Sequence, residues 1–220
     1  MARPSNTDER REQIAEALLV VMARHGYEGA SVAAVARQAG VATGLVHYHF
    51  QDKREILLVA LERLARRQSE RVEARLAGAG PSPRAQLDAW LRAHLEVGAG
   101  DPVGLACWVM AGGEALRDHV VQRAHAGVMA ASLEGLTGIV TRGLAEGEFA
   151  VREGPAGGRA AAVAIGALVQ GYFVLAAVAP GVTPAGSALE AARQMADGLL
   201  GGREEPGRAP KAKSTRGAKS

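Results

Sequence analysis

The chain has 220 residues, of which 48% are hydrophobic and 22% are charged; this length fits one medium domain or two small ones and excludes a large multidomain enzyme. These fractions are typical of globular proteins and exclude a chain that is disordered throughout. Basic residues number 12 against 10 acidic ones over 1–75, 8 against 11 over 76–202, and 6 against 2 over 203–220. A basic end after an acidic middle is compatible with nucleic-acid binding without establishing it.

The first part of the chain predicts four helices, because apolar residues recur at helical spacing between capping residues and glycines. We expect these helices over residues 6–26, 31–40, 43–50 and 52–77. Asp52 and Glu55 have the spacing of a capping box at the start of the fourth helix. On the buried face of the first helix we expect Ile14, Leu18, Val21, Met22 and His25.

The segment AGAGPSP over 77–83 is the clearest break in the chain. Beyond it, we expect helices over residues 83–97, 102–117, 119–146, 156–179 and 183–201, each bounded by Gly, Pro or Asp. No segment alternates with period two for long enough to predict a strand. The fold class is therefore all-α with about nine helices, divided into an N-terminal helical domain (1–52), a second helical domain (53–202) and a disordered basic tail (203–220).

Residues 31–50 form two short predicted helices joined by Gly40-Val41-Ala42-Thr43, which is the spacing of a helix-turn-helix. Val46 and Phe50 share one face of the second helix and are expected to pack on the preceding helices. The opposite face carries short or polar groups suited to phosphates and base edges, namely Thr43, Gly44, His47 and Tyr48.

The N-terminal sequence resembles the DNA-binding domain of the TetR family of transcriptional repressors over about residues 10–60. The matching positions are Gly26-Tyr27, Ser31-Val32, Val35-Ala36, Ala39-Gly40-Val41, Gly44, Tyr48-His49-Phe50, Lys53 and Leu57. Two positions depart from the family pattern: Ala42 stands where a capping Ser or Thr is usual, and His47 where an aromatic or small polar residue is common. These departures bear on the operator sequence rather than on the fold.

The resemblance implies phosphate contacts for Ser31, Thr43 and Lys53, backbone clamping for Tyr48 and His49, and proximity to the bases for Gly44 and His47. The alternative for each residue is a local structural role, as a helix cap or as the rim of the small core. Capping and phosphate contact can coexist at a helix start. The expected partner is an inverted-repeat operator in double-stranded DNA.

The resemblance further implies that the long fourth helix leads into a domain that binds a small-molecule effector and forms a homodimer through its last two helices. The run 160–179 is apolar on nearly every face and must be covered on all sides. Its length also fits a membrane span, but its many Ala residues, with Gln170 and Tyr172, favour a buried or dimer-forming helix.

Candidate effector-binding residues are the larger or more polarizable side chains of the second half, and each could instead belong to the core. They are Trp90, Cys107, Trp108, Met110, Met129, Tyr172 and Phe173. Cys107 could sense redox state, although a lone Cys in an apolar run is more often a small core residue. We expect a largely apolar effector whose polarity could be selected by Glu114, Arg117 or Arg123.

No catalytic or metal-binding arrangement is evident, so we expect neither an enzyme, nor a cofactor, nor a metal site. His94 stands alone, and His119 and His125 face different directions on their predicted helix. The single cysteine and the absence of a signal peptide favour a cytoplasmic protein. Two alternatives remain: a constitutive nucleoid or division factor of the same fold, and a helical ligand-binding protein that has lost operator binding.

Overall fold

The computed structural model describes residues 6–96, 101–151, 154–184 and 186–201, and within these ranges it contains nine helices and no strand. The all-α prediction is therefore confirmed. The predicted tail, 203–220, lies outside the described residues. The helices are α1 (Asn6–Gly29), α2 (Val32–Ala39), α3 (Thr43–His49), α4 (Lys53–Gly78), α5 (Pro83–Leu95), α6 (Pro102–Ala115), α7 (His119–Ala145), α8 (Gly154–Val178) and α9 (Ser187–Leu200).

Most helix starts are fixed by a side-chain oxygen that accepts a hydrogen bond from a backbone N–H of the first turn. The capping residues are Ser31, Asp52, Ser82, Asp101 and Asp118. The predicted capping box at Asp52 is present in a shifted form. Asp52 accepts from the Glu55 amide at 2.8 Å, and Glu55 in turn accepts from the amide of Gln51, also at 2.8 Å.

The first helix differs from its prediction at its C-terminal end. Gly26 adopts φ 71° and ψ 170°, so that the helix bends there and continues to Gly29. The four apolar residues expected on its inner face are buried, but His25 is exposed. The expectation for His25 was wrong: the helix bends at the next residue, Gly26, and the core that buries Met22 in the same turn does not reach His25.

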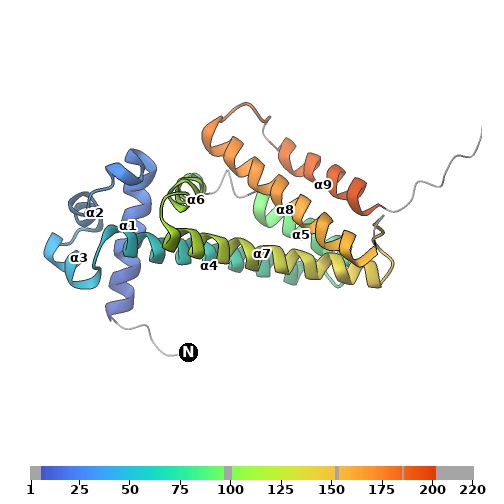
Figure 1. Cartoon of the computed structure of the whole chain (residues 1–220), viewed down its shortest axis with the longest axis horizontal. Coiled ribbons are helices and arrows are strands. Elements are labelled where there is room, and N and C mark those ends of the chain that lie inside the picture. Colours follow the sequence, from blue (N-terminus) through green and yellow to red (C-terminus); the bar gives the residue numbers. More distant parts are fainter. Residues whose placement is uncertain (1–5, 97–100, 152–153, 185, 202–220) are drawn as a thin grey trace, which may run out of the picture.

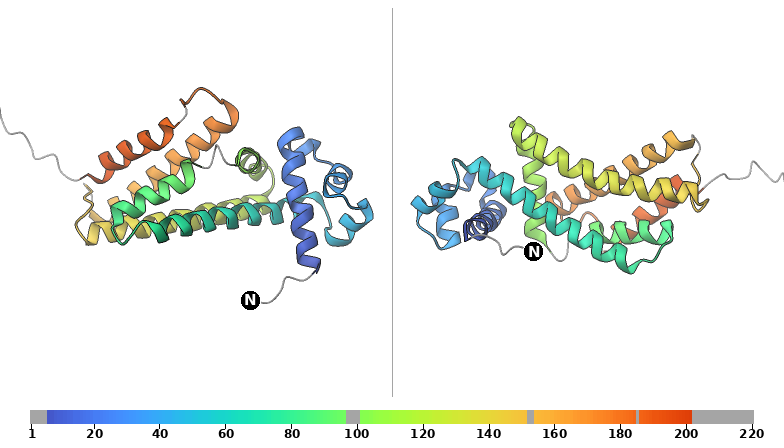
Figure 2. Two further views of the ribbon diagram at one scale, coloured as in Figure 1. Left: turned by 180° about the vertical axis from the view of Figure 1, so that it is seen from behind. Right: turned by 90° about the horizontal axis from the view of Figure 1, so that it is seen from below.

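Helix α4 links the two ends of the molecule (Figure 1). Its first half contributes Ile56, Leu57 and Leu64 to a hydrophobic cluster with α1–α3, whereas Val72 and Leu76 pack against a second cluster among α5, α7, α8 and α9. We call α1–α3 the N-terminal unit and α5–α9 the C-terminal unit. Figure 2 shows the same arrangement from behind and from below.

The two units are also joined through α6, which lies across α4 beside α1 (Figure 1). Cys107 and Ala111 of α6, together with Val121 of α7, are buried in the first cluster. A movement of α6 relative to the other C-terminal helices would therefore displace the residues of the N-terminal unit that pack against it.

One helix among the described residues, Gly157–Val178, is long and apolar enough to cross a membrane by length and composition alone. Only 22% of its most apolar window is buried inside this chain. Much of the surface of this apolar helix is therefore not covered by its own chain.

Candidate nucleic-acid interface

The helix-turn-helix is formed by α2 and α3 and the tight turn between them. Gly40 adopts the left-handed conformation, with φ 67°, which a residue with a side chain rarely adopts. The Val41 amide donates to the Ala36 carbonyl at 3.0 Å and closes the turn. Val46 and Phe50 are buried as predicted, so the opposite face of α3 points outward.

The outward face of α3 carries the four residues that the sequence grouped together. Thr43, Gly44, His47 and Tyr48 are all exposed, and Tyr48 retains 80% of its accessible surface. A Cβ atom at Gly44 would meet nothing within 4 Å, so the backbone here is open to close approach. The face has the shape and polarity of a recognition helix. Its contacts with DNA remain a prediction.

The other candidate DNA contacts differ in how exposed their side chains are and in the contacts they already make within the chain. Ser31 is exposed, and its Oγ accepts from the Ala34 amide at 3.2 Å, so it acts at least as a cap. His49 is partly buried beside Tyr48, with the two rings nearly perpendicular and their centroids 5.1 Å apart. Ala42 is the N-cap of α3 and supplies no side-chain hydrogen bond.

Lys53 makes several contacts within its own chain. Its Nζ donates to the Tyr27 carbonyl at 2.8 Å, lies 4.1 Å from the centre of the Tyr27 ring, and is 3.9 Å from a Glu28 carboxylate oxygen. Burial, together with nearby carboxylates, raises the pKa of Tyr27 to about 12. The structure therefore gives Lys53 a bridging role between α1 and α4, and its phosphate contact is still a prediction.

Arg11 is an important residue that sequence analysis missed. Its guanidinium donates to the His49 carbonyl and to Glu55 at 2.8 Å, and lies 4.3 Å from the centre of the Phe50 ring. The Gln51 amide and Arg11 hold the pKa of Glu55 below its usual value. Arg11 thus fixes the C-terminal end of α3 against α1. No sequence signal marks it, because its partners lie 38 and 44 residues away.

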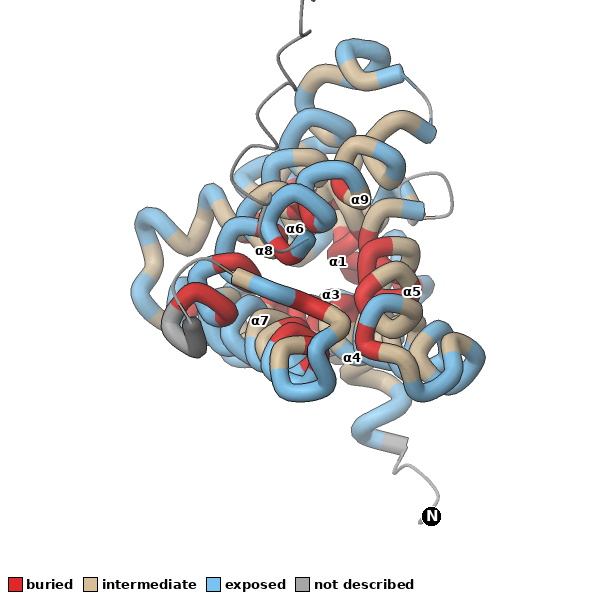
Figure 3. The backbone as a smooth tube through the Cα atoms, turned by 90° about the vertical axis from the view of Figure 1, so that its right-hand side faces the viewer, coloured by how far each residue is buried: buried red, intermediate tan, exposed pale blue. Residues whose placement is uncertain are grey.

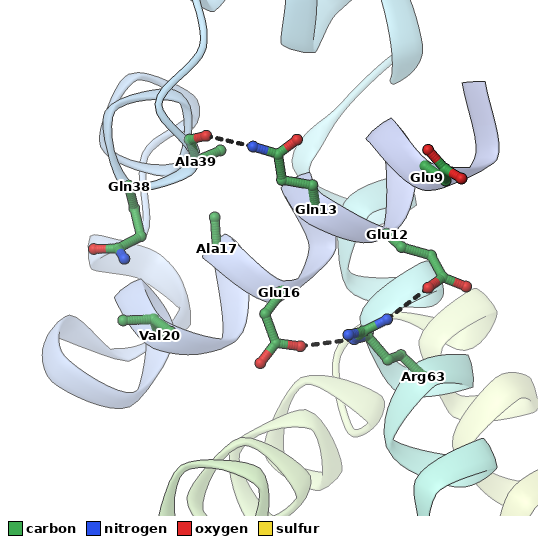
Figure 4. Close-up of a pocket in the computed structure, with 9 residues that line it drawn as sticks. All are labelled: Glu9, Glu12, Gln13, Glu16, Ala17, Val20, Gln38, Ala39 and Arg63. Carbon is green, nitrogen blue, oxygen red and sulfur yellow. Dashed lines mark hydrogen bonds and ion pairs between the residues drawn. The ribbon is translucent and has the colours of Figure 1, made fainter. Parts of the chain in front are cut away.

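Ion pairs fix α1 to α4 beside a groove of about 450 Å³ (Figure 4). Arg63 donates to Glu12 at 2.6 Å and to Glu16 at 2.7 Å. Arg66 and Arg67 make further ion pairs with the same two carboxylates. The orientation of the N-terminal unit on α4 is therefore held by a network rather than by a single pair.

In the C-terminal unit, two of the candidate effector residues meet at His94. The His94 ring lies 3.9 Å from the Trp90 ring and 6.4 Å from the Phe173 ring, measured between centroids. His94 Nδ1 is 2.8 Å from the Trp90 carbonyl, and Nε2 is 3.3 Å from the Ser132 hydroxyl. Burial lowers the pKa of His94 to about 4, so the ring is neutral at pH 7.

A second polar cluster surrounds Trp108. Its indole stacks on His125 with centroids 4.0 Å apart, and its Nε1 donates to Gln170 at 3.1 Å. His125 Nε2 is buried without a hydrogen-bond partner, and burial lowers the pKa of this ring. The cluster joins α6, α7 and α8 through polar contacts inside an otherwise apolar region.

The remaining effector candidates lie elsewhere. Cys107 is buried in the first cluster, where its Sγ lies 3.2 Å from the Leu19 carbonyl, and burial raises the pKa of its thiol to about 12. Met110 packs against the same cluster, and Met129 is 39% exposed on α7. Tyr172 is partly buried on α8. Cys107 therefore has the environment of a core residue rather than that of a reactive thiolate.

Helices α8 and α9 both expose apolar side chains. On α8, exposed apolar residues recur at helical spacing, at Ala160, Val163, Ala164, Ala167, Gly171, Val174, Leu175 and Val178. On α9, Met195 and Leu199 are 51% and 41% exposed. Figure 3 shows the buried segments of these helices turned toward the interior and the exposed ones turned outward. We refer to this surface as the α8–α9 face.

Taken together, an exposed recognition helix and a long helix leading into a larger all-α unit define a helix-turn-helix DNA-binding regulator. Comparison with known proteins supports this class and gives the family. The model of the bacterial regulatory proteins of the tetR family matches residues 14–60, and that of the C-terminal domain of BetI-type transcriptional repressors matches residues 83–201. The chain belongs to the TetR family of transcriptional regulators, with a C-terminal domain of the BetI type.

Individual relatives agree with this assignment. The chain is 27% identical to the HTH-type transcriptional regulator BetI of Burkholderia thailandensis over 87% of this chain and 93% of that protein. It is 26% identical to BetI of Paraburkholderia phymatum, over 91% and 97% respectively. The confirmed resemblance thus extends well beyond the N-terminal segment that suggested it.

Solved structures share the fold at lower identity. A TetR-family regulator from Cytophaga hutchinsonii superposes with a TM-score of 0.77 at 17% identity, covering 92% of this chain and all of that one. A regulator from Saccharomonospora viridis, solved in complex with choline, gives a TM-score of 0.72 at 21% identity, covering 87% of this chain and 95% of that one. At these identities, the likeness establishes the fold alone.

Proposed function

We propose that the protein is a homodimeric, cytoplasmic repressor that binds an inverted-repeat operator and is released from it by a small, largely apolar effector. The observation that carries the proposal is the coexistence of two uncovered surfaces of opposite character in one chain. One is the polar outer face of α3, and the other is the apolar α8–α9 face. A repressor dimer requires a surface of each kind, one for DNA and one for its partner subunit.

The DNA side of the proposal rests on the geometry of α3. Its exposed residues and the open backbone at Gly44 suit insertion into a major groove. Two copies related by a two-fold axis would read two half-sites of an inverted repeat, spaced by about one helical turn of DNA or a multiple of it. His47 would then contribute to sequence preference, and Tyr48 to binding of the DNA backbone.

The dimer side rests on the α8–α9 face. Contiguous apolar surface of this extent is costly to leave in water, and its small residues allow helices of two subunits to approach closely. Paired across a two-fold axis, α8 and α9 of each subunit would form a four-helix interface. A dimer also accounts for the low burial of α8 within a single chain without invoking a membrane.

For the effector, we propose a site among α5, α6, α7 and α8 that involves Trp90, Trp108, Tyr172 and Phe173. Cys107 and Met110 are left out of this site because they belong to the first cluster, and Met129 because it is exposed. Trp108 also packs against the first cluster, but it is kept because it contacts His125 and Gln170. The neighbouring structure from Saccharomonospora viridis holds choline, which supports small-molecule binding by a protein of this fold. The chemistry of the effector must be decided by this chain's own residues.

The proposed signal passes through α6. Cys107 lies against the Leu19 carbonyl of α1, and the next residue, Trp108, is hydrogen-bonded to Gln170 of α8. A ligand that displaced Trp108 would shift α6 and with it the N-terminal unit. The ligand would lower operator affinity only if its own affinity differs between the original and the shifted arrangement of α6.

The proposal is tested by selecting operator sequences from a random DNA library and measuring the affinity with and without a metabolite extract. An effector-released repressor binds a two-fold symmetric sequence and loses affinity in the extract. Tight binding that no extract changes favours the constitutive DNA-binding factor instead. Extract components that bind while no DNA sequence is selected favour the ligand-binding protein without operator binding.

A further inference from the structure

Helix α4 carries six arginines, and Arg71 differs from the other five. Arg54, Arg63, Arg66, Arg67 and Arg75 each form an ion pair with a carboxylate. Among the described residues, Arg71 has no carboxylate oxygen within 4.0 Å. Its Nε atom is also buried without a hydrogen-bond partner. A buried unpaired N–H group is costly, and one on a guanidinium is a ready donor to an anion.

The Arg71 side chain is held in place by a neutral neighbour. Its Nη2 donates to the Gln68 side chain at 2.5 Å, and Gln68 Nε2 donates in turn to the Ala93 carbonyl of α5 at 3.2 Å. This arrangement holds the guanidinium beside a glutamine that is itself bound to α5, without neutralising its charge. A guanidinium positioned before a ligand arrives loses little further freedom when it binds.

Arg71 is connected to the proposed effector site through neighbouring residues. Gln68, which accepts from Arg71, donates to the carbonyl of Ala93, the residue before His94, and the His94 ring lies between Trp90 and Phe173. His94 itself is neutral and directed at Trp90 and Ser132, so it does not oppose an anion. Figure 2 shows α4 and α5 side by side at this end of the molecule.

Charged groups near Arg71 partly balance one another. Asp101 and Glu70 favour its charged form, whereas burial and Arg67 oppose it. The Asp101 carboxylate already has a partner, because it caps α6 by accepting a hydrogen bond from the Gly104 amide at 2.8 Å. Glu70 is exposed to solvent, so Arg71 is the partly buried charge near this cluster that has no direct ionic partner among the described residues.

From these contacts we infer that the effector is an organic anion, with an apolar or aromatic body beside Trp90 and Phe173 and a carboxylate or similar group bound by Arg71. This inference rests on the proposed effector site and names the chemical class of its ligand. It makes Arg71 the residue that selects an anion over a neutral or cationic compound of the same shape.

The test compares compounds that differ in charge but not in shape, using the full-length protein. One set is 3,3-dimethylbutanoate, 3,3-dimethylbutan-1-ol and choline, and the other is benzoate, benzyl alcohol and benzylammonium. Binding is measured by calorimetry for the wild type, for Arg71→Gln and for the control Arg75→Gln, an arginine of the same helix paired with Glu96 at 2.6 Å. Arg71→Lys tests whether charge alone suffices.

We expect at least one anion to bind about tenfold or more tightly than its neutral match, the preference typical of a hydrogen bond to a charged group. Arg71→Gln should abolish this preference and Arg75→Gln should keep it, with Arg71→Lys between them. Should Arg71→Gln not fold, the charge preference of the wild type and the effect of Arg71→Lys still decide the matter.

Tighter binding of choline or benzylammonium, an anion affinity that Arg71→Gln leaves unchanged, or the absence of anion binding at millimolar concentration would each overturn the inference. A metabolite extract that still releases the operator would then show that only the anion class is wrong. If the extract is inactive as well, the effector part of the proposed function fails with it.

Discussion

The Lys53 ammonium lies 4.1 Å from the centre of the Tyr27 ring and donates to the Tyr27 carbonyl at 2.8 Å. The start of α4 is thereby bound to the last turn of α1. A lysine in this position can stabilise the N-terminal unit, contact a phosphate, or do both, and the two roles respond differently to substitution.

Replacing Lys53 distinguishes these roles. If Lys53 acts within the protein, Lys53→Met lowers the melting temperature and leaves the salt dependence of operator binding unchanged. If it contacts a phosphate, the slope of log affinity against log salt falls by about 0.9. We expect a loss of stability of about 1 kcal/mol, because a hydrogen bond and a cation–π contact are lost. Thermal melts and salt titrations of operator binding measure the two effects.

The outer face of α3 gives a second prediction. Tyr48→Ala should weaken binding to all DNA sequences without changing stability, because its side chain is 80% exposed. His47→Ala should instead change which operator is selected. Arg123→Ala, at an exposed position on α7, is the matched control and should alter neither property. Unchanged operator binding in both α3 variants would show that α3 does not dock as proposed.

The α8–α9 face gives a third prediction. Val174→Asp places a charge in the centre of the proposed interface and should convert the dimer to a monomer in light scattering. Leu116→Asp is the control, since Leu116 is 85% exposed at the end of α6 and lies outside this face. A wild-type protein that is monomeric at micromolar concentration would contradict the proposed dimer directly.

Ala42 permits a stabilising substitution. Its backbone, at φ −68° and ψ 143°, already has the conformation of an N-cap, but its side chain offers no acceptor. Ala42→Ser should raise the free energy of unfolding by about 1 kcal/mol by supplying that acceptor. Ala42→Val, which adds no acceptor and is as poor an N-cap as Ala, should not raise it. Denaturant melts of the three proteins provide the comparison.

His94 makes stability depend on pH. Its pKa is about 4 in the folded protein against 6.5 when exposed, so below pH 6.5 the unfolded chain binds the proton and the folded one does not. Stability should therefore fall as the pH drops from about 6.5 toward 4, by up to about 3 kcal/mol. His94→Gln should lose much of this dependence, whereas His25→Gln, at an exposed position, should retain it. Urea melts across this pH range test the difference.

The local features of the fold could be predicted because they depend on residues close together in sequence. The helices, the cap at Ser31 and the burial of Val46 and Phe50 belong to this group. Contacts between distant residues could not be predicted. Cys107 lies 88 residues from Leu19, and nothing in its neighbourhood indicates that it packs against the first helix.

The effector candidates show the same limit. A search for large side chains selected Trp90 and Phe173, but it could not identify Arg71, which is one of six arginines on a helix rich in charge. What distinguishes Arg71 is the absence of a partner, and this depends on where every other carboxylate lies in the folded chain. Periodicity assigns a residue to a face of a helix, but not to a partner on another helix.

The ion pairs between α1 and α4 affect how salt titrations of this protein are to be interpreted. Glu12 and Glu16 are about 40% exposed, so their attraction to the α4 arginines weakens as ions are added. Added salt then acts twice: it reduces the free energy gained when counterions are released from the DNA, and it loosens the packing of α1 on α4 that orients α3. The measured slope is then steeper than the phosphate contacts alone would give, and the excess should vanish when Arg63, Arg66 and Arg67 are all replaced by uncharged residues.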